Sequence, residues 1–494
     1  MCGLAAIWGA KDTAPVREML RLQSHRGPDG QALRPVDRGE AILGHCRLAI
    51  IDPEGGEQPL DTRDGSWSLI ANGMIYNDKE LRGENPATAY RTGSDSESIL
   101  HLITQHGPHA VSRLDGMFAF VLANNERLIA ARDPVGIKPL YFGEKDGAIA
   151  FASEAKALSG YCDSITEFPA GAVFDSATGM HRYYDIPDGA PAAWKEADAI
   201  AALKETIERA VIKRLRSDVP FGALLSGGLD SSIIAAIAAR HVDNFKTFAV
   251  GFEGSADLVA ARRVARHIGS DHRELILKPD EVVQALPEIL YHLESFDQDL
   301  VRSAVPCYFV SKLAADHVKV VLTGEGADEL FAGYRYHRDI TDPDALRDEL
   351  RGSVARMHNI NLQRVDRMSM AHGLEARVPF LDRDVIALGL SLPVEMRLRR
   401  KQDSVVEKWI LRKAFEDILP PEIVWRTKVQ FDEGSGTAGF LAAALGVEQD
   451  GANSSHPNGR SAEEARYREI LSDQYESPQA ILDLVAHWDP QLQA

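Results

Sequence analysis

The sequence predicts two domains of different fold class, a β-rich α+β domain followed by an α/β domain built on a parallel sheet. A chain of 494 residues is longer than one hydrophobic core usually supports. Residues 1–190 contain short apolar runs separated by Gly, Asn, Asp and Pro, a pattern typical of strands joined by turns. In residues 191–494, apolar runs alternate with helical patterns, which is typical of a parallel sheet covered by helices. A Pro- and Ala-containing stretch, residues 186–193, is expected to be the linker.

The individual elements follow from the same patterns. In the first domain, strands are expected at residues 2–8, 41–51, 67–76, 117–122 and 148–152, and a helix at 96–105. In the second domain, helices are expected at residues 198–215 and 258–268, and a further helix is expected to run from the end of the sequence SGGLDSS, residues 226–232, through residue 240. Strands are expected at residues 221–225, 245–252 and 318–322. The Gly-, Ser- and Asn-containing stretch 432–460 is expected to be a mobile loop or tail.

Composition limits the classes of function. With 45% hydrophobic and 26% charged residues, the chain is expected to be a soluble globular protein. The formal net charge of −18 argues against nucleic acid as a partner, so anionic substrates need local cations, backbone amides or a metal. No apolar run approaches the roughly 18 residues of a membrane span, and no secretory signal is visible. Four scattered cysteines without a CxxC pair argue against zinc and disulfides and favour a cytoplasmic location.

The first motif is the opening MCGLAAIWG, which places a cysteine at position 2. Most isolated cysteines are small, buried and inert. Removal of Met1, however, would leave Cys2 with a free α-amine of pKa about 8, which could act as the base for its own thiol. The apolar run that follows would hold this residue at a fixed point. An ordered series of further motifs favours the chemical interpretation: SHRGPDG, GHCRLAIID, ANGMIYN, TGSDSE, LDGMFAF, ARDPVGIKPLYFG and FASEAKAL.

This series resembles the class-II glutamine amidotransferase domain across essentially the whole first domain, and therefore implies an N-terminal-nucleophile fold with αββα layers. The resemblance makes Cys2 the nucleophile that hydrolyses glutamine. It implies that Arg47 grips the α-carboxylate of glutamine and that Asp95 holds its α-ammonium group. The Asn72 side chain and the Gly73 amide would form the oxyanion hole. Backbone around Ile50 and Ile51 would line the pocket.

One position departs from the pattern of that family. The motif is normally NGEIYN, but Met74 stands here in place of the glutamate that helps bind the α-ammonium group. Methionine cannot accept this charge-assisted hydrogen bond, which is worth roughly 1.5–3 kcal/mol. Either a carboxylate from elsewhere compensates or glutamine binds weakly; a neutral exchange with rearranged neighbours is a third alternative. We predict a raised KM for glutamine, higher than that of a Met74→Glu variant, with free ammonia as a competing nitrogen source.

A second set of motifs lies in the second domain. SGGLDSS at residues 226–232 sits between an apolar run and a helix, where small residues let the backbone approach a pyrophosphate. No GKS or GKT follows, so this is not a Walker A motif. TGEGADE at 323–329 follows a later strand, so that Asp230 and Asp328 are expected near each other. Carboxylates suit Mg²⁺, although Asp230 could instead merely cap its helix.

The SGGLDSS motif resembles the pyrophosphate loop of ATP pyrophosphatases, whose domain has the adenine nucleotide α-hydrolase-like fold. Together with the motifs HGLEARVPFLD and WRTKVQF, it makes residues 1–440 similar to asparagine synthetases of the glutamine-hydrolysing type. A weaker similarity is found at residues 467–470. The resemblance implies that Glu325 is the acid needed for the activation and amination of aspartate. It also implies that Glu375 and Arg377 shape the side of the synthetase site where the acceptor, aspartate, binds. The implied ATP-binding residues are Leu225, Ser226, Gly227, Gly228, Asp230, Ser231, Val250, Thr323, Gly324 and Lys428, with Asp230 and Asp328 as metal ligands.

The implied reaction joins the two domains. Aspartate attacks ATP to give β-aspartyl-AMP and pyrophosphate, and ammonia released at Cys2 displaces AMP to give asparagine. The expected partners are glutamine, aspartate, ATP and Mg²⁺, without nucleic acid or membrane, and a homodimer is a candidate assembly. Two alternatives stay open: an acyl-adenylating amide synthetase with another acceptor or a preference for ammonia, and a non-catalytic scaffold. A tRNA-thiolating enzyme would need catalytic cysteines near the loop and a basic surface, and the sequence has neither. Cys2 and Glu325 favour asparagine synthesis over the activity of β-lactam synthetase-like relatives, which tend to lose these residues.

Overall fold

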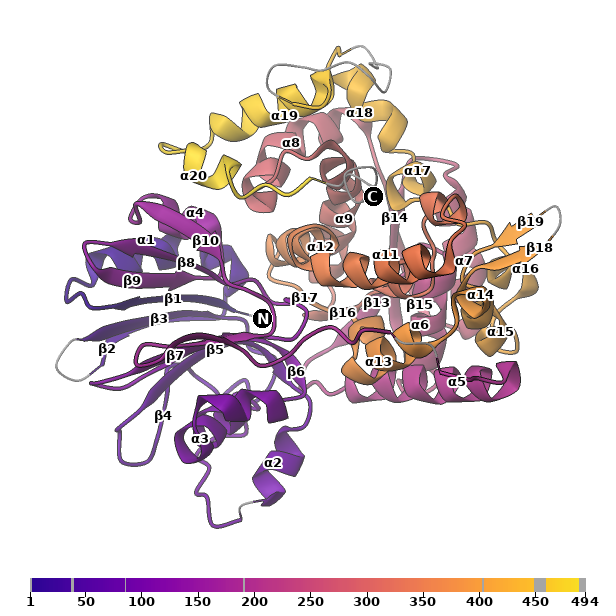
Figure 1. Cartoon of the computed structure of the whole chain (residues 1–494). Coiled ribbons are helices and arrows are strands. Elements are labelled where there is room, and N and C mark those ends of the chain that lie inside the picture. The colour runs from indigo at the N-terminus through magenta and orange to yellow at the C-terminus, as the bar shows by residue number, and fades with distance from the viewer. Residues whose placement is uncertain are drawn as a thin grey trace.

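The computed structural model describes residues 2–36, 40–84, 86–189, 192–401, 404–447 and 459–487. Its first domain holds two six-stranded antiparallel sheets stacked on each other (Figure 1). The first sheet has the order β10 (Ser164–Glu167), β8 (Tyr141–Lys145), β9 (Ala148–Ala152), β1 (Gly3–Trp8), β3 (Ala41–Arg47) and β2 (Gly30–Pro35). The second has the order β12 (Gly179–Arg182), β11 (Ala172–Asp175), β7 (Leu128–Arg132), β6 (Gly116–Ala123), β5 (Ser68–Ile75) and β4 (Leu60–Asp61).

Alternation of side chains along the strands produces the layers. On β1, Leu4 and Ala6 pack between the two sheets, whereas Ala5 and Ile7 pack against the outer helices α1 (Ala14–Leu22) and α4 (Ala155–Ser159). On the far side, α3 (Glu97–His106) and α2 (Asp78–Glu84) contribute to a separate core against β5 and β6. The domain therefore has the αββα arrangement, and the predicted fold class is confirmed.

The second domain is built on a five-stranded parallel sheet of order β15 (Asp271–Ile276), β14 (Lys246–Gly251), β13 (Phe221–Leu224), β16 (Val320–Leu322) and β17 (Glu375–Arg377). Strands β14, β16 and β17 are largely buried on both faces, whereas the edge strand β15 is mostly exposed or half-buried. Phe248 and Val250 of β14 pack against one group of helices, and Ala249 between them packs against the other. The first group includes α8 (Pro279–Leu293), α9 (Gln298–Ala315) and α12 (Asn361–Met370), and the second includes α5 (Glu196–Lys213), α6 (Leu229–Ala239) and α7 (Ala256–Ile268).

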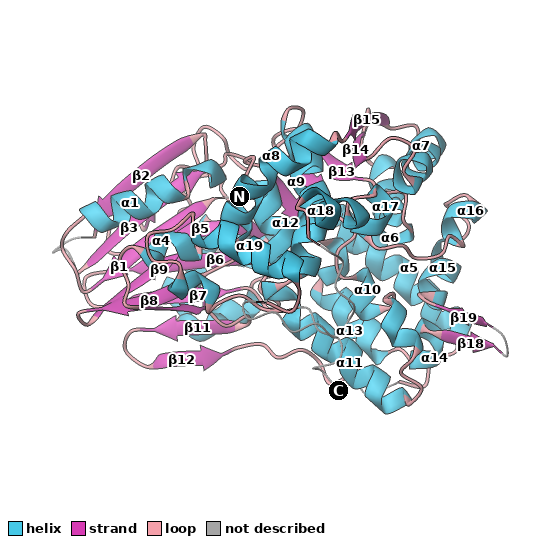
Figure 2. Ribbon diagram, turned by 90° about the horizontal axis from the view of Figure 1, so that it is seen from above, coloured by secondary structure: helices cyan, strands magenta, loops and turns pink. Residues whose placement is uncertain are grey.

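Most of the remaining elements lie around this sheet (Figure 2), whereas the last helix, α20 (Gln479–Leu482), contacts α4 and β10 of the first domain. The others are α10 (Ala327–Leu330), α11 (Pro343–Arg356), α13 (Arg383–Ser391), α14 (Val394–Arg397), β18 (Arg399–Lys401), β19 (Ser404–Val406), α15 (Trp409–Phe415), α16 (Pro421–Val424), α17 (Phe431–Ser435), α18 (Ala438–Ala444) and α19 (Ala462–Ser472). In the parts of the chain that the structure describes, no helix has the length and apolar character needed to cross a membrane.

Two expectations from the sequence need correction. The strand expected over residues 41–51 ends at Arg47, because the chain then leaves the sheet, and Leu48, Ile50 and Ile51 line a cavity instead. The stretch 432–460 is not simply a loop, since α17 and α18 occupy much of its first part, while residues 448–458 lie outside the described residues. Residues 190 and 191 of the expected linker also lie outside them; β12 ends at Arg182, and α5 begins at Glu196.

Candidate active sites

Cys2 lies at the buried end of the first sheet, directly before β1. Its backbone amide donates a hydrogen bond to Asn72 Oδ1 at 2.9 Å, and Asn72 belongs to the second sheet. Among the described residues, Asn72 Nδ2 is buried without a hydrogen-bond partner. A buried donor beside a nucleophile suits an oxyanion better than a neutral ground state. The next residue, Gly73, has a φ of 155°, and a Cβ there would lie 2.1 Å from Met117 O, so only glycine fits.

The Cys2 thiol is activated by its surroundings. Burial alone would raise its pKa, but the charge of His45, a hydrogen bond to His45 and the charge of the amino terminus lower the pKa to about 7. His45 is itself buried on β3, with Nε2 3.1 Å from Ala71 O. By contrast, burial raises the pKa of the other three cysteines, Cys46, Cys162 and Cys307, to about 12. Cys2 is therefore the cysteine with thiolate character near neutral pH.

Sequence reasoning missed His45. Its only local signal was its place in the GHCR motif, beside Arg47. The pairing of β1 with β3 puts Leu4 opposite His45 and Gly3 opposite Cys46, which brings His45 onto the same face as Cys2. The strand register supplies this contact, and it cannot be read from either strand alone.

A small cavity of about 30 Å³ surrounds Cys2. It brings together seven of the residues predicted for glutamine hydrolysis and binding: Cys2, Arg47, Ile50, Ile51, Gly73, Met74 and Asp95. Burial raises the pKa of Asp95 to about 6, even though its carboxylate accepts a hydrogen bond from Ile75 N at 2.6 Å. Arg47 donates to Asp52 O and Pro53 O at 2.6 and 2.8 Å.

The same cavity also contains Glu375, a residue of the second domain that the resemblance assigned to the acceptor side. Glu375 Oε1 accepts a hydrogen bond from Arg377 Nε at 2.6 Å. Arg377 Nη1 in turn donates to Arg214 O and Arg216 O at 2.6 and 2.5 Å. Neither Glu375 nor Arg377 lines the second cavity, at the carboxyl ends of β13, β14 and β16. Glu375 lines the cavity around Cys2, and Arg377 ties the segment after α5 to β17.

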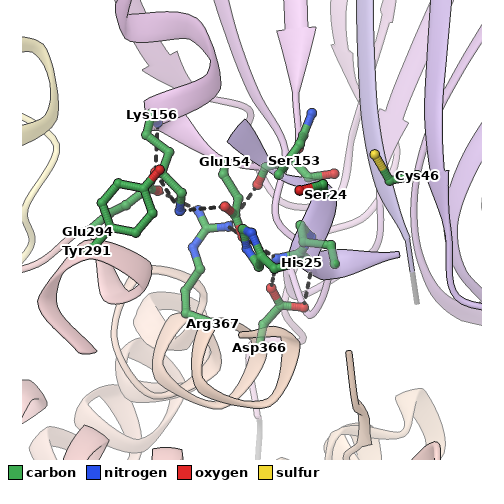
Figure 3. A network of polar contacts seen from close by, with 12 residues as sticks. Ser24, His25, Cys46, Ser153, Glu154, Lys156, Tyr291, Glu294, Asp366 and Arg367 are labelled. Carbon is green, nitrogen blue, oxygen red and sulfur yellow. Dashed lines mark hydrogen bonds and ion pairs between the residues drawn. The ribbon is translucent and has the colours of Figure 1, made fainter. Parts of the chain in front are cut away.

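A buried network of charges joins Cys2 to the second domain. Arg26 donates from Nε to Cys2 O at 3.1 Å and forms ion pairs with Glu154 and with Asp366 of α12, both at 2.8 Å. Arg367 of α12 lies between Glu154 and Glu294, at 3.1 and 2.8 Å (Figure 3). All five side chains are almost completely buried, so loss of one would leave its partners uncompensated. The network therefore fixes the position of Cys2 relative to α12.

The second cavity, of about 210 Å³, lies beyond the carboxyl ends of β13, β14 and β16. It brings together all but one of the residues predicted for ATP and the metal, and Glu325 with them: Leu225, Ser226, Gly228, Asp230, Ser231, Val250, Thr323, Gly324, Glu325, Asp328 and Lys428. Gly227 is outside its lining but shapes the turn, because its φ is 72° and a Cβ would lie 2.4 Å from Ala261 N. The turn leads into the N-terminus of α6, which favours a bound anion.

Two lysines and two aspartates form the charged wall of this cavity. Lys408 Nζ lies 2.6 Å from both Asp230 Oδ2 and Asp328 Oδ1, and Lys428 Nζ lies 2.7 Å from Asp328 Oδ2. Burial would raise the pKa of Asp328, but the charges of Lys408 and Lys428 hold it well below its usual range. Asp230 Oδ1 is buried without a hydrogen-bond partner among the described residues, so it fits a metal ligand. Asp328 fits less well, because lysines contact both of its oxygens.

Sequence reasoning missed two residues of this cavity. Lys408 has a left-handed φ of 53° in the turn before α15, and nothing in its local sequence marks its position between two carboxylates. Arg364 of α12 donates from Nη2 to Glu325 Oε1 at 2.6 Å and so holds the acid of the GEGADE motif. Both contacts join segments that are distant in the sequence.

Comparisons with known proteins agree with this arrangement. The model of the glutamine amidotransferase domain family matches residues 1–185, and that of the asparagine synthase family matches residues 202–352 and 338–492. Asparagine synthetase [glutamine-hydrolyzing] 3 of Arabidopsis thaliana is 40% identical over 460 residues, covering 88% of this chain and 79% of that protein. The enzyme of Asparagus officinalis is 40% identical over 465 residues, covering 88% and 78%. The chain therefore belongs to the family of glutamine-hydrolysing asparagine synthetases.

Proposed function

We propose that the chain is a carbon–nitrogen ligase that makes asparagine from aspartate, ATP and the amide nitrogen of glutamine. The observation that carries the proposal is the presence of two chemically different cavities in one chain. One is lined by a cysteine whose pKa is lowered to about 7. The backbone of this cysteine is held by Asn72, which lies outside the cavity lining and has a buried donor, Nδ2. The other cavity holds a glycine-containing turn at a helix N-terminus together with lysines and carboxylates.

In the first cavity, the Cys2 thiolate attacks the amide carbon of glutamine. The α-amine of Cys2, exposed by removal of Met1, takes the thiol proton and delivers it to the departing ammonia. Asn72 Nδ2 and the Gly73 amide stabilise the oxyanion of the tetrahedral intermediate. Arg47 binds the α-carboxylate, Asp95 the α-ammonium group, and Ile50 and Ile51 line the pocket. Water then hydrolyses the glutamyl thioester to glutamate.

In the second cavity, the β-carboxylate of aspartate attacks the α-phosphorus of ATP and pyrophosphate leaves. Small residues of the turn 226–231 and the N-terminus of α6 hold the phosphates, while Leu225, Val250, Thr323 and Gly324 contact the adenosine part. Lys408 and Lys428 neutralise negative charge on the phosphates, and Glu325, held by Arg364, serves the activation and amination of aspartate.

Mg²⁺ is part of the proposal, with Asp230 Oδ1 as the better ligand and Asp328 as the second. When bound, the ion would neutralise charge on the pyrophosphate.

We also propose a division into domains 1–190 and 191–494, supported by the end of β12 at Arg182 and the start of α5 at Glu196. A cytoplasmic location accords with four free cysteines, and a homodimer rests on family resemblance alone.

The proposal is tested by product analysis with aspartate, ATP and Mg²⁺ and either glutamine or ammonium as the nitrogen source. We expect asparagine, AMP and pyrophosphate from both, with glutamate formed only from glutamine. Absence of asparagine with both nitrogen sources would show that the acceptor is wrong. In that case pyrophosphate release should be measured with other carboxylic acids, since an acyl-adenylating enzyme with another acceptor would still release it.

A further inference from the structure

The cavity around Cys2 crosses the domain boundary. Its lining comes from the first domain except for Glu375, which lies on β17 at the edge of the parallel sheet that faces the first domain (Figure 1). The backbone of Glu375 is fixed by a hydrogen bond from its N–H to Lys319 O at 2.9 Å, and β17 pairs with β16. The side chain therefore enters the cavity from a rigid element of the other domain.

The loop after β3, which supplies Ile50 and Ile51 to the cavity, is also held by the second domain. Asp218 Oδ2 accepts a hydrogen bond from Asp52 N at 2.8 Å, and Asp218 N donates to Ile50 O at 3.2 Å. Arg216 forms an ion pair with Asp78, just after β5. These contacts set the distance between Glu375 and the first-domain residues that line the same cavity. The glutamine pocket is therefore formed by both domains together.

Two carboxylates, Asp95 and Glu375, share this cavity. Burial accounts for most of the rise in the pKa of Asp95, and the negative charge of Glu375 raises it further, by more than the charge of Arg377 lowers it. Burial would also raise the pKa of Glu375, but Arg377, the amino terminus and Lys138 hold it at about 2, so Glu375 stays ionised. Two acids in one buried space favour a bound cation.

Met74 lies in the same cavity and carries no charge. Glutamine brings one cation into the pocket, its α-ammonium group. A carboxylate has about four acceptor positions, so an ion pair with Arg377 is compatible with a contact to a second cation. We infer that Glu375, reaching across the domain boundary, supplies the counter-charge for the α-ammonium group of glutamine that Met74 cannot supply. This inference rests on the proposed hydrolysis of glutamine at Cys2.

The test is Glu375→Gln, which keeps the size of the side chain and removes its charge. Glutamate release is measured as a function of glutamine concentration, and 4-carbamoylbutanoate, which lacks the α-ammonium group, is measured as an inhibitor. We expect the KM for glutamine to rise about 10- to 100-fold, the loss of one charge-assisted hydrogen bond. The inhibition constant of the analogue should change less than twofold. Equal weakening of both ligands, or of neither, would overturn the inference.

Two further variants separate binding from structure. Adding Met74→Glu to Glu375→Gln restores a carboxylate from the first domain and should return the KM for glutamine to within a few fold of wild type. Asp115→Asn removes another carboxylate of the domain interface, one that pairs with Lys213 at 2.7 Å outside the cavity, and should leave the KM unchanged. Failure of the rescue, or an equal effect of Asp115→Asn, would make Glu375 merely an interface residue. If wild-type protein released no glutamate, the proposed function itself would fail.

Discussion

Replacing Asn72 by Asp separates the two roles of this side chain. The Oδ1 atom, which accepts from Cys2 N at 2.9 Å, is retained, whereas the buried Nδ2 donor is lost. Loss of one oxyanion-hole donor lowers kcat by roughly 10²–10³, or about 2.7–4 kcal/mol in the activation free energy. The new negative charge beside Cys2 also raises the pKa of the thiol above about 7, because an adjacent anion disfavours the thiolate. The pH profile of glutamine hydrolysis should therefore shift towards alkaline pH.

The assay is the rate of glutamate release at saturating glutamine from pH 5.5 to 9.5, with the melting temperature as a check of folding. Asn72→Ala removes both interactions without adding a charge, so it should lower kcat by at least as much as Asn72→Asp without the alkaline shift. A loss of less than tenfold in kcat for both variants, with a higher KM instead, would mean that Asn72 only binds glutamine. The oxyanion assignment would then be refuted.

Three further predictions follow from the two cavities. Cys2→Ala should abolish glutamine-dependent synthesis and spare ammonia-dependent synthesis; loss of both would contradict separate sites. We proposed that Asp95 binds the ammonium group of glutamine in its ionised form. Because the pKa of Asp95 is raised to about 6, the KM for glutamine should then rise about tenfold per pH unit as the pH falls below 6 and stay level above 7. Lys408→Gln removes the cation between Asp230 and Asp328, so the free energy of unfolding should fall by roughly 3–5 kcal/mol and the melting temperature with it. Added Mg²⁺ should raise the melting temperature of this variant by more than it raises that of the wild-type protein. An equal response of both proteins to Mg²⁺ would exclude a cation site there.

Elements with a clear local pattern were predictable from the sequence. The strand at residues 148–152 coincides with β9, and the helix expected at 96–105 lies within one residue of α3 at each end, because their apolar periodicity comes from burial on one or two faces. The same rule failed at residues 48–51, where Leu48, Ile50 and Ile51 line the cavity around Cys2 and pack into the main hydrophobic core without belonging to a sheet. Burial in a pocket and burial in a sheet leave the same signal in a short run of sequence.

The residues that the sequence could not assign depend on contacts between distant segments. The register between β1 and β3 brings His45 to Cys2. Lys408 lies between two aspartates, in a turn where its own backbone has a left-handed conformation. Glu375 follows the same rule over a longer distance, since its place beside Cys2 depends on the docking of one domain on the other. A motif identifies a residue as chemically important, but only the packing of the chain decides which of two cavities it enters.

The position of α12 links the two cavities physically. Its Arg364 holds Glu325 in the nucleotide cavity, and its Asp366 pairs with Arg26, which contacts Cys2 O. Glu375 adds a second connection, from the parallel sheet into the glutamine pocket. Any movement of the second domain when ATP and aspartate bind would therefore change the charge and shape around Cys2, since both the backbone of Cys2 and a wall of its pocket are held by that domain. We therefore expect glutamine hydrolysis in this chain to depend on the docked second domain for the shape of its site, as well as for the use of its ammonia.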